Sequence, residues 1–364
     1  MAAMTRRERF ERALRHEEVD RLPFWVKIFS PSYLDFQDER YRTMGELALA
    51  DLLDLDHMAW GDSPVAGVND RIEQTAEQQE GSRIVRFKTP DGRLTMAERF
   101  AKSSTSWHPS EFPIKTLADL RAARHLFEGT RFTLDDDRLE RAKERIRAVG
   151  DRGIVLVAVG ISPVMNLIQH LLGPEQTYLF LADYPAEMDE LIGVMHEERL
   201  RYLRCLLTNC PYVYLMSVEN TSTTLLSPEV FARTCWRHLA DYGRLIREAG
   251  RCHILHMCGK LKALLPRIDE LPAVAIEAFT APPLGDATLA DRAALCPSKA
   301  VIGGTQATLW LRPAEEICAA IERSIAEAGG FRGVVLTSAG VMPPACSIPK
   351  IRQVRELVRR IAAK

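Results

Sequence analysis

Short apolar runs separated by longer amphipathic segments dominate the chain from residue 150 onward. Six runs are nearly continuous in apolar residues: 153–160, 212–220, 252–258, 273–279, 300–306 and 333–340. Strands of this kind are buried on both faces, and their alternation with helices predicts βαβ units and a parallel sheet. The segment 227–250 is the best-marked helix, with Ser227 as N-cap, Pro228 at its first position and Gly250 at its end.

The first 150 residues are less regular. Thr5 and Glu8 have the spacing of a capping box and predict a first helix, and the apolar residues after Pro23 predict a buried strand. Residues 83–99 alternate on both sides of Pro-Asp-Gly at 90–92, which predicts a hairpin, the one clearly antiparallel element.

Together these elements predict an α/β fold, a TIM-type (β/α)8 barrel with an N-terminal helical and hairpin elaboration. The chain has no G-x-G-x-x-G segment, which would have favoured a dinucleotide-binding sheet. No linker or repeat divides the chain. We expect one domain over 1–364, with the elaboration and first strands in 1–150 and regular β/α units in 151–364.

The charge balance and the composition limit the binding partners and the cellular compartment that we expect. The 48 Lys and Arg residues nearly balance the 49 Asp and Glu residues, and no basic cluster predicts nucleic acid or an anionic membrane as a partner. No apolar run is long enough to span a bilayer, and the N-terminus has no secretory pattern. The eight cysteines are scattered without a disulfide framework, so we expect a cytoplasmic protein with reduced thiols.

The candidate chemistry lies where the strands end, because barrels of this class carry their sites at the carboxyl ends of the strands. In the stretch CHILHMCGK, His256 and Cys258 share one side of a strand at its carboxyl end. Imidazole with thiolate is a ligand pair suited to Zn2+, and a catalytic zinc needs a third protein ligand. Cys346 after the last strand is one candidate and Glu219 is the oxygen candidate. The alternative is a buried cysteine and a hydrogen-bonded core histidine.

Other polar and aromatic residues are candidates for the same site, at the mouth of the barrel where the carboxyl ends of the strands open. Asn220 and Gln306 at neighbouring strand ends are candidates for orienting substrate, although each is equally well explained as a solvated loop residue. Four aromatic residues of the N-terminal region are candidates for the wall of the mouth, or for the core: Trp25, Phe29, Tyr33 and Trp60.

Five segments resemble the uroporphyrinogen decarboxylase superfamily, in the family's order. They are TRRERFERALRHEEVDRLPFW, GPEQTYLFLADYPAEMDELI, LLSPEVFARTCWRHLADY, HMCGK and IGGTQATLWLRPAEEI. The resemblance spans nearly the whole chain and implies a TIM-like barrel. It also implies one of two activities: decarboxylation of uroporphyrinogen without a cofactor, or cobalamin-dependent methyl transfer with zinc bound by His-x-Cys and a later Cys.

The decarboxylases of this superfamily resemble one another in an early arginine-containing segment that grips propionates. The corresponding region here, PFWVKIFSPSYLDF, offers only Lys27 as a substrate-binding cation, which argues against a substrate with eight carboxylates. In the methyltransferase pattern His256 and Cys258 match, but Gly340 stands where the later Cys is usual, and Cys346 follows Pro343-Pro344 instead. The third ligand is therefore Cys346 or Glu219, or the site binds no zinc.

The resemblance thus implies a zinc-assisted methyltransferase that moves a methyl group between a small O-, N- or S-methyl substrate and a corrinoid protein. No Asp-x-His-x-x-Gly segment is present, so cobalamin is expected on a separate protein as co-substrate. Glu219 is expected as an oxygen ligand or as the general acid. The alternatives are a tetrapyrrole decarboxylase, a non-catalytic corrinoid- or tetrapyrrole-binding barrel and, last, a zinc hydrolase. The methyl donor or acceptor, the direction of transfer and the oligomeric state stay open.

Overall fold

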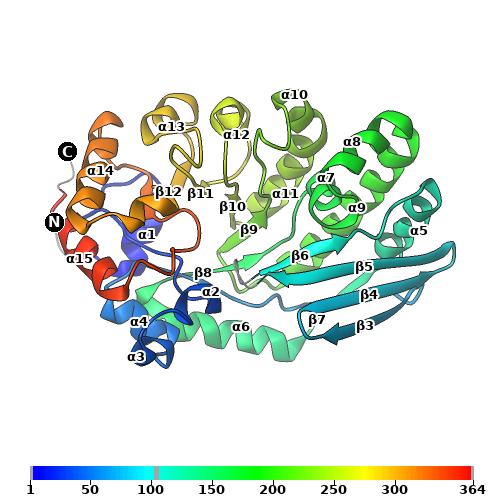
Figure 1. The fold of residues 1–364 in the computed structure, drawn as a ribbon, viewed down its shortest axis with the longest axis horizontal. Helices are drawn as coiled ribbons and strands as arrows, with labels where there is room; N and C mark the ends of the chain where they lie inside the picture. Colours follow the sequence, from blue (N-terminus) through cyan, green and yellow to red (C-terminus); the bar gives the residue numbers. More distant parts are fainter. Residues whose placement is uncertain (1–2, 102–105, 362–364) are drawn as a thin grey trace.

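A curled parallel sheet of seven strands forms the centre of the molecule (Figure 1). The structure is a computed structural model that describes residues 3–101 and 106–361. In spatial order the strands are β1 (His57–Trp60), β8 (Gly153–Ala158), β9 (Tyr214–Val218), β10 (Cys252–His256), β11 (Ala275–Phe279), β12 (Ala300–Gly304) and β13 (Val334–Thr337). All six runs predicted as strands are strands in this sheet.

The segment after Pro23 does not form the complete strand that the sequence predicts. Phe24 makes an isolated parallel bridge to Leu336 of β13, and its carbonyl oxygen accepts the Asp56 N–H, directly before β1, at 2.8 Å. The pairing stops early because the Ile28 N–H turns back to the Val26 carbonyl oxygen at 3.1 Å. The described residues thus show an α/β fold with seven regular parallel strands and this bridged segment, in place of the eight strands expected.

Helices cover the outer face of the sheet. They include α7 (Pro163–Asn166) with the π-helix η2 (Leu167–Leu171), α8 (Pro174–Asp183), α9 (Pro185–Thr208), α12 (Leu265–Asp269), α13 (Leu289–Leu295), α14 (Ala314–Glu327) and α15 (Ile348–Val358). The predicted helix after Ser227 comprises α10 (Pro228–Phe231), the π-helix η3 (Ala232–Trp236) and α11 (Arg237–Glu248). Within the described ranges, no helix combines the length and apolarity that crossing a membrane demands.

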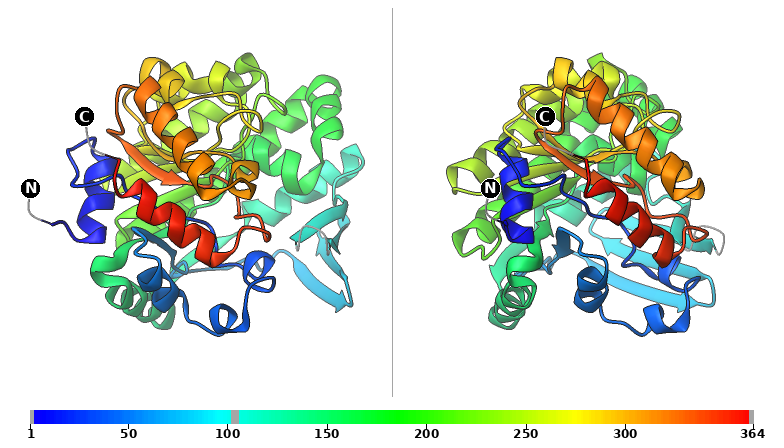
Figure 2. Two further views of the ribbon diagram at one scale, coloured as in Figure 1. Left: turned by 60° about the vertical axis from the view of Figure 1, so that its left-hand side comes forward. Right: turned by 90° about the vertical axis from the view of Figure 1, so that its left-hand side faces the viewer.

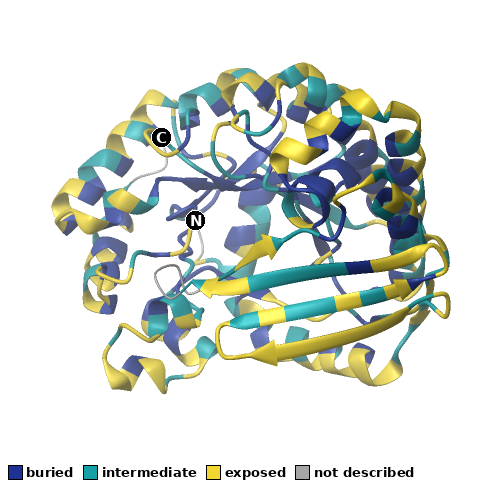
Figure 3. Cartoon of the chain, turned by 45° about the vertical axis from the view of Figure 1, so that its right-hand side comes forward, coloured by how far each residue is buried: buried dark blue, intermediate teal, exposed yellow. Residues whose placement is uncertain are grey.

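The antiparallel part is larger than the predicted hairpin. The turn at Pro90–Asp91 does join β4 (Ser82–Thr89) to β5 (Gly92–Ala101), but β3 (Glu73–Gln79) and β6 (Ser106–Glu111) extend these strands to a four-stranded sheet. A further pair is formed by β2 (Val65–Val68) and β7 (Arg131–Leu134). The sequence hides β3 because the strand is exposed along its whole length and has no apolar face (Figure 3).

The amino-terminal helices lie around one end of the parallel sheet, on the side where both chain ends are found (Figure 2). They are α1 (Arg6–Leu14), α2 (Pro31–Leu34), α3 (Glu39–Arg42) and α4 (Glu46–Leu52). By contrast, α5 (Leu117–Glu128) packs on α9 and β5 at the opposite side, and α6 (Asp136–Val149) packs on β8 (Figure 1). The Thr5 side chain caps α1 by accepting the Glu8 N–H at 3.0 Å, as predicted.

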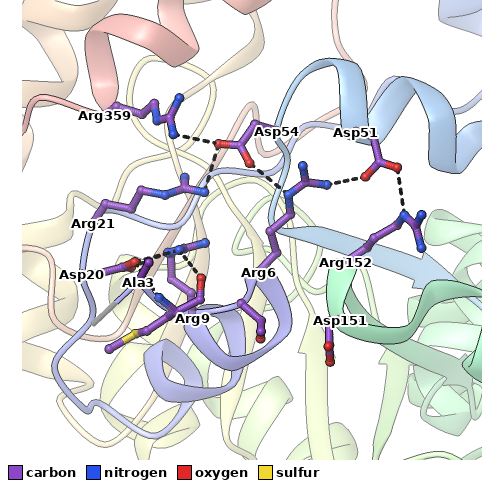
Figure 4. Close-up of a pocket in the computed structure, with 12 residues that line it drawn as sticks. Ala3, Arg6, Arg9, Asp20, Arg21, Asp51, Asp54, Asp151, Arg152 and Arg359 are labelled. Atoms are coloured by element: carbon purple, nitrogen blue, oxygen red, sulfur yellow. Dashed lines mark hydrogen bonds and ion pairs between the residues drawn. The ribbon is translucent and has the colours of Figure 1, made fainter. Parts of the chain in front are cut away.

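A dense ion-pair network stands at the amino-terminal ends of the strands, which α1 covers (Figure 4). The Asp54 carboxylate forms ion pairs with four guanidinium groups, those of Arg6, Arg21, Arg355 and Arg359. These arginines come from α1, from the segment before Phe24 and from the carboxyl-terminal helix, so one carboxylate joins both ends of the chain to the sheet.

Candidate active site

Strand register brings three charged side chains together at the carboxyl end of the sheet. His256, the last residue of β10, is paired with Glu277 on β11, and residues paired in a parallel sheet point to the same face. The His256 Nδ1 atom is hydrogen-bonded to Glu277 Oε2, and Lys27 Nζ lies 2.6 Å from Glu277 Oε1. The bridged segment and two strands thus hold a Lys–Glu–His chain.

The two cations and the carboxylate differ in exposure. Glu277 is 1% exposed, whereas the side chains of Lys27 and His256 are each 19% exposed. The carboxylate of this three-residue cluster is therefore buried, and its two cations lie closer to solvent. Burial alone raises the pKa of Glu277, but the charge of Lys27 and the bond from His256 outweigh it and lower the pKa. Burial likewise acts to lower the pKa of His256, but hydrogen bonds with Cys258 and Glu277 and the Glu277 charge raise the pKa to about 9.

Cys258 lies beside the imidazole, as the alternation of the strand predicts. Its side chain is within hydrogen-bond reach of His256, and its Sγ donates to Asn220 Oδ1 at 3.6 Å. The Asn220 amide is held by Gln169 of η2, whose Oε1 accepts Asn220 Nδ2 at 2.7 Å. The backbone of Asn220 has a φ of +51° and its N–H bonds to the His256 carbonyl oxygen at 3.0 Å. Asn220 is therefore locked beside the His–Cys pair.

Glu219 lies apart from this cluster. It is fully buried, its Oε2 accepts the Ser162 hydroxyl at 2.7 Å and its Oε1 accepts the Ser162 N–H. Burial raises the pKa of Glu219 to about 7, and its hydrogen bonds with Ser162 act in the opposite direction. Its neighbour two residues back, Ser217, bonds to His253, which packs against Gly243 of α11. The Glu219 carboxylate is thus on the helix side of the sheet, bonded to Ser162 rather than to His256 or Cys258.

Two other expected residues also make local contacts. Cys346 is fully buried, burial raises its pKa to about 11, and its carbonyl oxygen accepts the Tyr33 hydroxyl at 2.6 Å. Gln306 caps the short helix η5 (Ala307–Leu311), where its Oε1 accepts the Thr308 N–H at 2.7 Å. The described contacts do not bring Cys346 or Gln306 to His256.

The expected aromatic residues divide between core and surface. Trp25 and Tyr33 are buried, and Phe29 packs edge-on against the His57 ring at 4.9 Å. Trp60, the last residue of β1, is 48% exposed. Of these aromatic side chains, Trp60 is the one that offers its ring to solvent at a strand end.

The cluster suits zinc in ligand type but not in ligand number. The bond from His256 Nδ1 to Glu277 leaves Nε2 free, and a carboxylate behind a histidine is the usual support of a zinc-binding imidazole. Cys258 adds a sulfur. Over the described ranges, however, no three His, Cys, Asp or Glu side chains are grouped closely enough to hold a metal. A catalytic zinc needs three protein ligands, and the structure brings two together.

The sequence matches the model of a known protein family. The family model described as uroporphyrinogen decarboxylase (URO-D) matches residues 115–361, more than half of the chain. The chain belongs to the uroporphyrinogen decarboxylase family. A search of the curated proteins found no match. The family assignment confirms the resemblance seen in the four later sequence segments, which lie inside the matched range.

Solved structures with a similar fold include a methyltransferase. The "methyltransferase from Methanosarcina mazei" matches over 98% of this chain and 98% of that chain, with a TM-score of 0.61 and 13% sequence identity. A D-psicose 3-epimerase in the presence of D-fructose matches over 61% of this chain and 80% of that one at 10% identity, with a TM-score of only 0.33. The first match confirms the fold of this family member.

The sequence assigned no role to two residues of the cluster, Glu277 and Gln169. Glu277 stands at a strand end like the others, but only the register between β10 and β11 shows that it faces His256. Gln169 lies in a helical segment with no sign of its π-turn in the sequence. A carboxylate at the end of the strand that follows a His-x-Cys strand is the sequence signal that points to Glu277.

Proposed function

We propose that the protein is a zinc-assisted, corrinoid-dependent methyltransferase. The observation that carries the proposal is the His256–Cys258 pair at the carboxyl end of the sheet, with Glu277 behind the imidazole. The family assignment and the methyltransferase of similar fold support the reaction class.

The residues of this chain prepare the site for a soft cation. Glu277 holds Nδ1 of His256 and so directs Nε2 outward, and Lys27 balances the charge of Glu277. We propose His256 and Cys258 as ligands of Zn2+, and Cys346 as the third on its chemistry alone, because its sulfur is not grouped with theirs. Bound zinc would supply Lewis acidity that stabilises a thiolate or a departing alkoxide or phenolate.

The co-substrate we propose is cobalamin carried on a separate corrinoid protein, presented at the mouth near His256. The other substrate is a small O-, N- or S-methyl compound or its demethylated form. Asn220, Gln306 and Lys27 are proposed to position it. Of these, Asn220 already lies against Cys258, which supports its role most directly.

Glu219 is proposed as the general acid because its pKa of about 7 leaves a proton on the carboxyl near neutral pH. The present contacts of that carboxyl are with Ser162. A role in proton transfer therefore needs a substrate-bound arrangement that brings the carboxyl to the mouth, and the activity of Glu219→Gln tests it.

The test combines zinc content with methyl transfer. We expect about one zinc per chain in the wild type, and loss of most of it in His256→Ala and in Cys258→Ala. Methyl transfer between methylcobalamin and 2-mercaptoethanol, or from an aryl methyl ether to cob(I)alamin, should fall at least ~100-fold in both variants. Cys346→Ala serves as the internal comparison, since retention of zinc there removes Cys346 from the ligand set. A wild-type protein without zinc and without methyl transfer contradicts the proposal.

Decarboxylation of a tetrapyrrole is the second candidate, because the matching family model carries that name. Incubation of the metal-free protein with uroporphyrinogen tests it directly. Formation of coproporphyrinogen would favour this activity, whereas corrinoid binding without any turnover would favour a binding barrel.

A further inference from the structure

A second cavity lies on the outer helix layer. It has a volume of about 470 Å³ and is enclosed by residues of α8, the first turns of α9, η3 and the start of α11. Its lining includes Pro185, Asp189, Gly193, Arg233, Arg237 and His238. None of these residues takes part in the Lys27–Glu277–His256 cluster, so the cavity is separate from the proposed site of methyl transfer.

Two arginines line this cavity without partners of their own. Arg233 and Arg237 are four residues apart, so they project from the same side of the η3–α11 helix. Both side chains are exposed, and the contacts of residues 3–101 and 106–361 include no ion pair or side-chain hydrogen bond for either. Most other arginines that line cavities here are paired; Arg6 and Arg21, for example, both bind Asp54.

A buried imidazole lines the same cavity. His238 is 1% exposed, and neither of its ring nitrogens makes a well-formed hydrogen bond among the described residues, although the Thr234 backbone lies close enough to act on its pKa. Its ring packs on His196 with centroids 4.4 Å apart. Burial, followed by the nearby His196, lowers the pKa of His238 to about 4, so at neutral pH the ring is uncharged and has one N–H to donate. A buried donor without a partner is costly and points to a missing acceptor.

The amino terminus of α9 also opens at this cavity. Pro185 is the first residue of this 24-residue helix, and no side chain caps its free N–H groups. The positive end of a long helix favours an anion. Two unpaired guanidinium groups, a buried imidazole without an acceptor and an uncapped helix end thus converge on one space.

We infer that this cavity binds the oxyanion of a small molecule, either a phosphate or a carboxylate. Asp189 lines the cavity as well, so a molecule that also carries an ammonium group complements the site better than a bare polyanion. Arg233 and Arg237 bind the oxyanion, with the His238 ring beside it, and Asp189 binds the ammonium group.

Isothermal titration calorimetry at constant ionic strength tests the inference. The probes are phosphoethanolamine and β-alanine, which carry an ammonium group with a phosphate or a carboxylate, and the reference is sodium chloride. We expect saturable binding of at least one probe, and which probe binds identifies the oxyanion. The double variant Arg233→Ala/Arg237→Ala should bind at least tenfold more weakly. The control Arg204→Ala/Arg247→Ala removes two exposed arginines from α9 and α11 outside the cavity and should bind like the wild type.

A steric variant separates the cavity from the general charge of the surface. No atom lies within 4 Å of the position that a Cβ at Gly193 would take, so Gly193→Leu fills the cavity while preserving α9. We expect it to abolish binding without lowering Tm. The inference is overturned if neither probe binds saturably, or if the arginine double variant and Gly193→Leu both bind like the wild type.

Discussion

The two ends of the parallel sheet use charged residues in opposite ways. At the amino-terminal end, the Asp54 carboxylate is surrounded by guanidinium groups from Arg6, Arg21, Arg355 and Arg359. At the carboxyl end, the Glu277 carboxylate contacts two charged side chains among the described residues, Lys27 and His256, and the cluster continues through the neutral side chains of Cys258 and Asn220. The first end uses its charges to hold segments together, and the second presents an imidazole and a thiol to which we assign the proposed chemistry.

This difference follows the division of labour in barrel-like α/β folds, where the carboxyl ends of strands carry function and the opposite face carries stability. Variants at the amino-terminal end should therefore change the free energy of unfolding and spare the reaction. Variants of the Lys27–Glu277–His256 cluster should do the reverse.

The largest effect is expected from Glu277→Gln. Without the carboxylate, burial and the Lys27 charge are opposed only by the hydrogen bond with Cys258, so the pKa of His256 in metal-free protein should fall below about 9. An NMR titration of the imidazole measures this change. Methyl transfer should fall roughly 10- to 100-fold because the imidazole loses its support. A His256 pKa that stays near 9 would show that Cys258 alone maintains it.

Asp54→Asn is expected to destabilise the protein by about 3 kcal/mol, because it leaves the buried Arg355 without a counter-charge. Asparagine tolerates the φ of +47° at this position, so the change isolates the charge. Urea unfolding provides the measurement. The control is Asp151→Asn, a carboxylate that lines the same pocket but has no ion pair among the described residues (Figure 4). Equal losses in the two variants would contradict the assigned role of Asp54.

Glu219→Gln should change the dependence of stability on pH. A carboxyl with a folded pKa of about 7, above its ordinary 4.5, binds a proton more tightly when folded. The contribution of Glu219 to stability is therefore greatest below pH 4.5 and decreases by up to about 3 kcal/mol as the pH rises to 7. The glutamine variant should lose this slope in unfolding curves recorded at several pH values. If Glu219 is the general acid, its methyl transfer also falls ~100-fold.

The smallest effect is expected from Gln306→Ala. The loss of its cap on η5 should destabilise the protein by about 1 kcal/mol. Thermal unfolding measures that loss, and KM for the methyl substrate separates the two roles of Gln306. An unchanged KM assigns Gln306 to the cap, whereas a several-fold rise assigns it to the substrate.

The parallel strands were predictable from the sequence because burial on both faces leaves continuous apolar runs, as in β8 and β11. The helix after Ser227 was predictable because Ser227 and Pro228 mark its start and Gly250 marks its end. The strand β3 was not predictable, since a fully exposed edge strand has no apolar face. The early end of pairing after Phe24 depends on a turn at Val26–Ile28 that is made by backbone atoms alone.

The site was predictable only as far as one strand determines it. Alternation within β10 places His256 and Cys258 together without any knowledge of neighbouring strands. The choice between Glu219 and Glu277 depends on register, because Val218 is paired with His256 and Glu219 consequently faces the other way. A shift of one residue between β9 and β10 would exchange these two faces, and the sequence of a single chain does not record that register.

The convergence of both chain ends on Asp54 also bears on the order in which the protein is made. Arg6 and Arg21 leave the ribosome more than 300 residues before Arg355 and Arg359. The early segments must therefore wait for α15 before their shared carboxylate is fully surrounded. Completion of this network is an electrostatic closure between segments that are synthesised far apart in time.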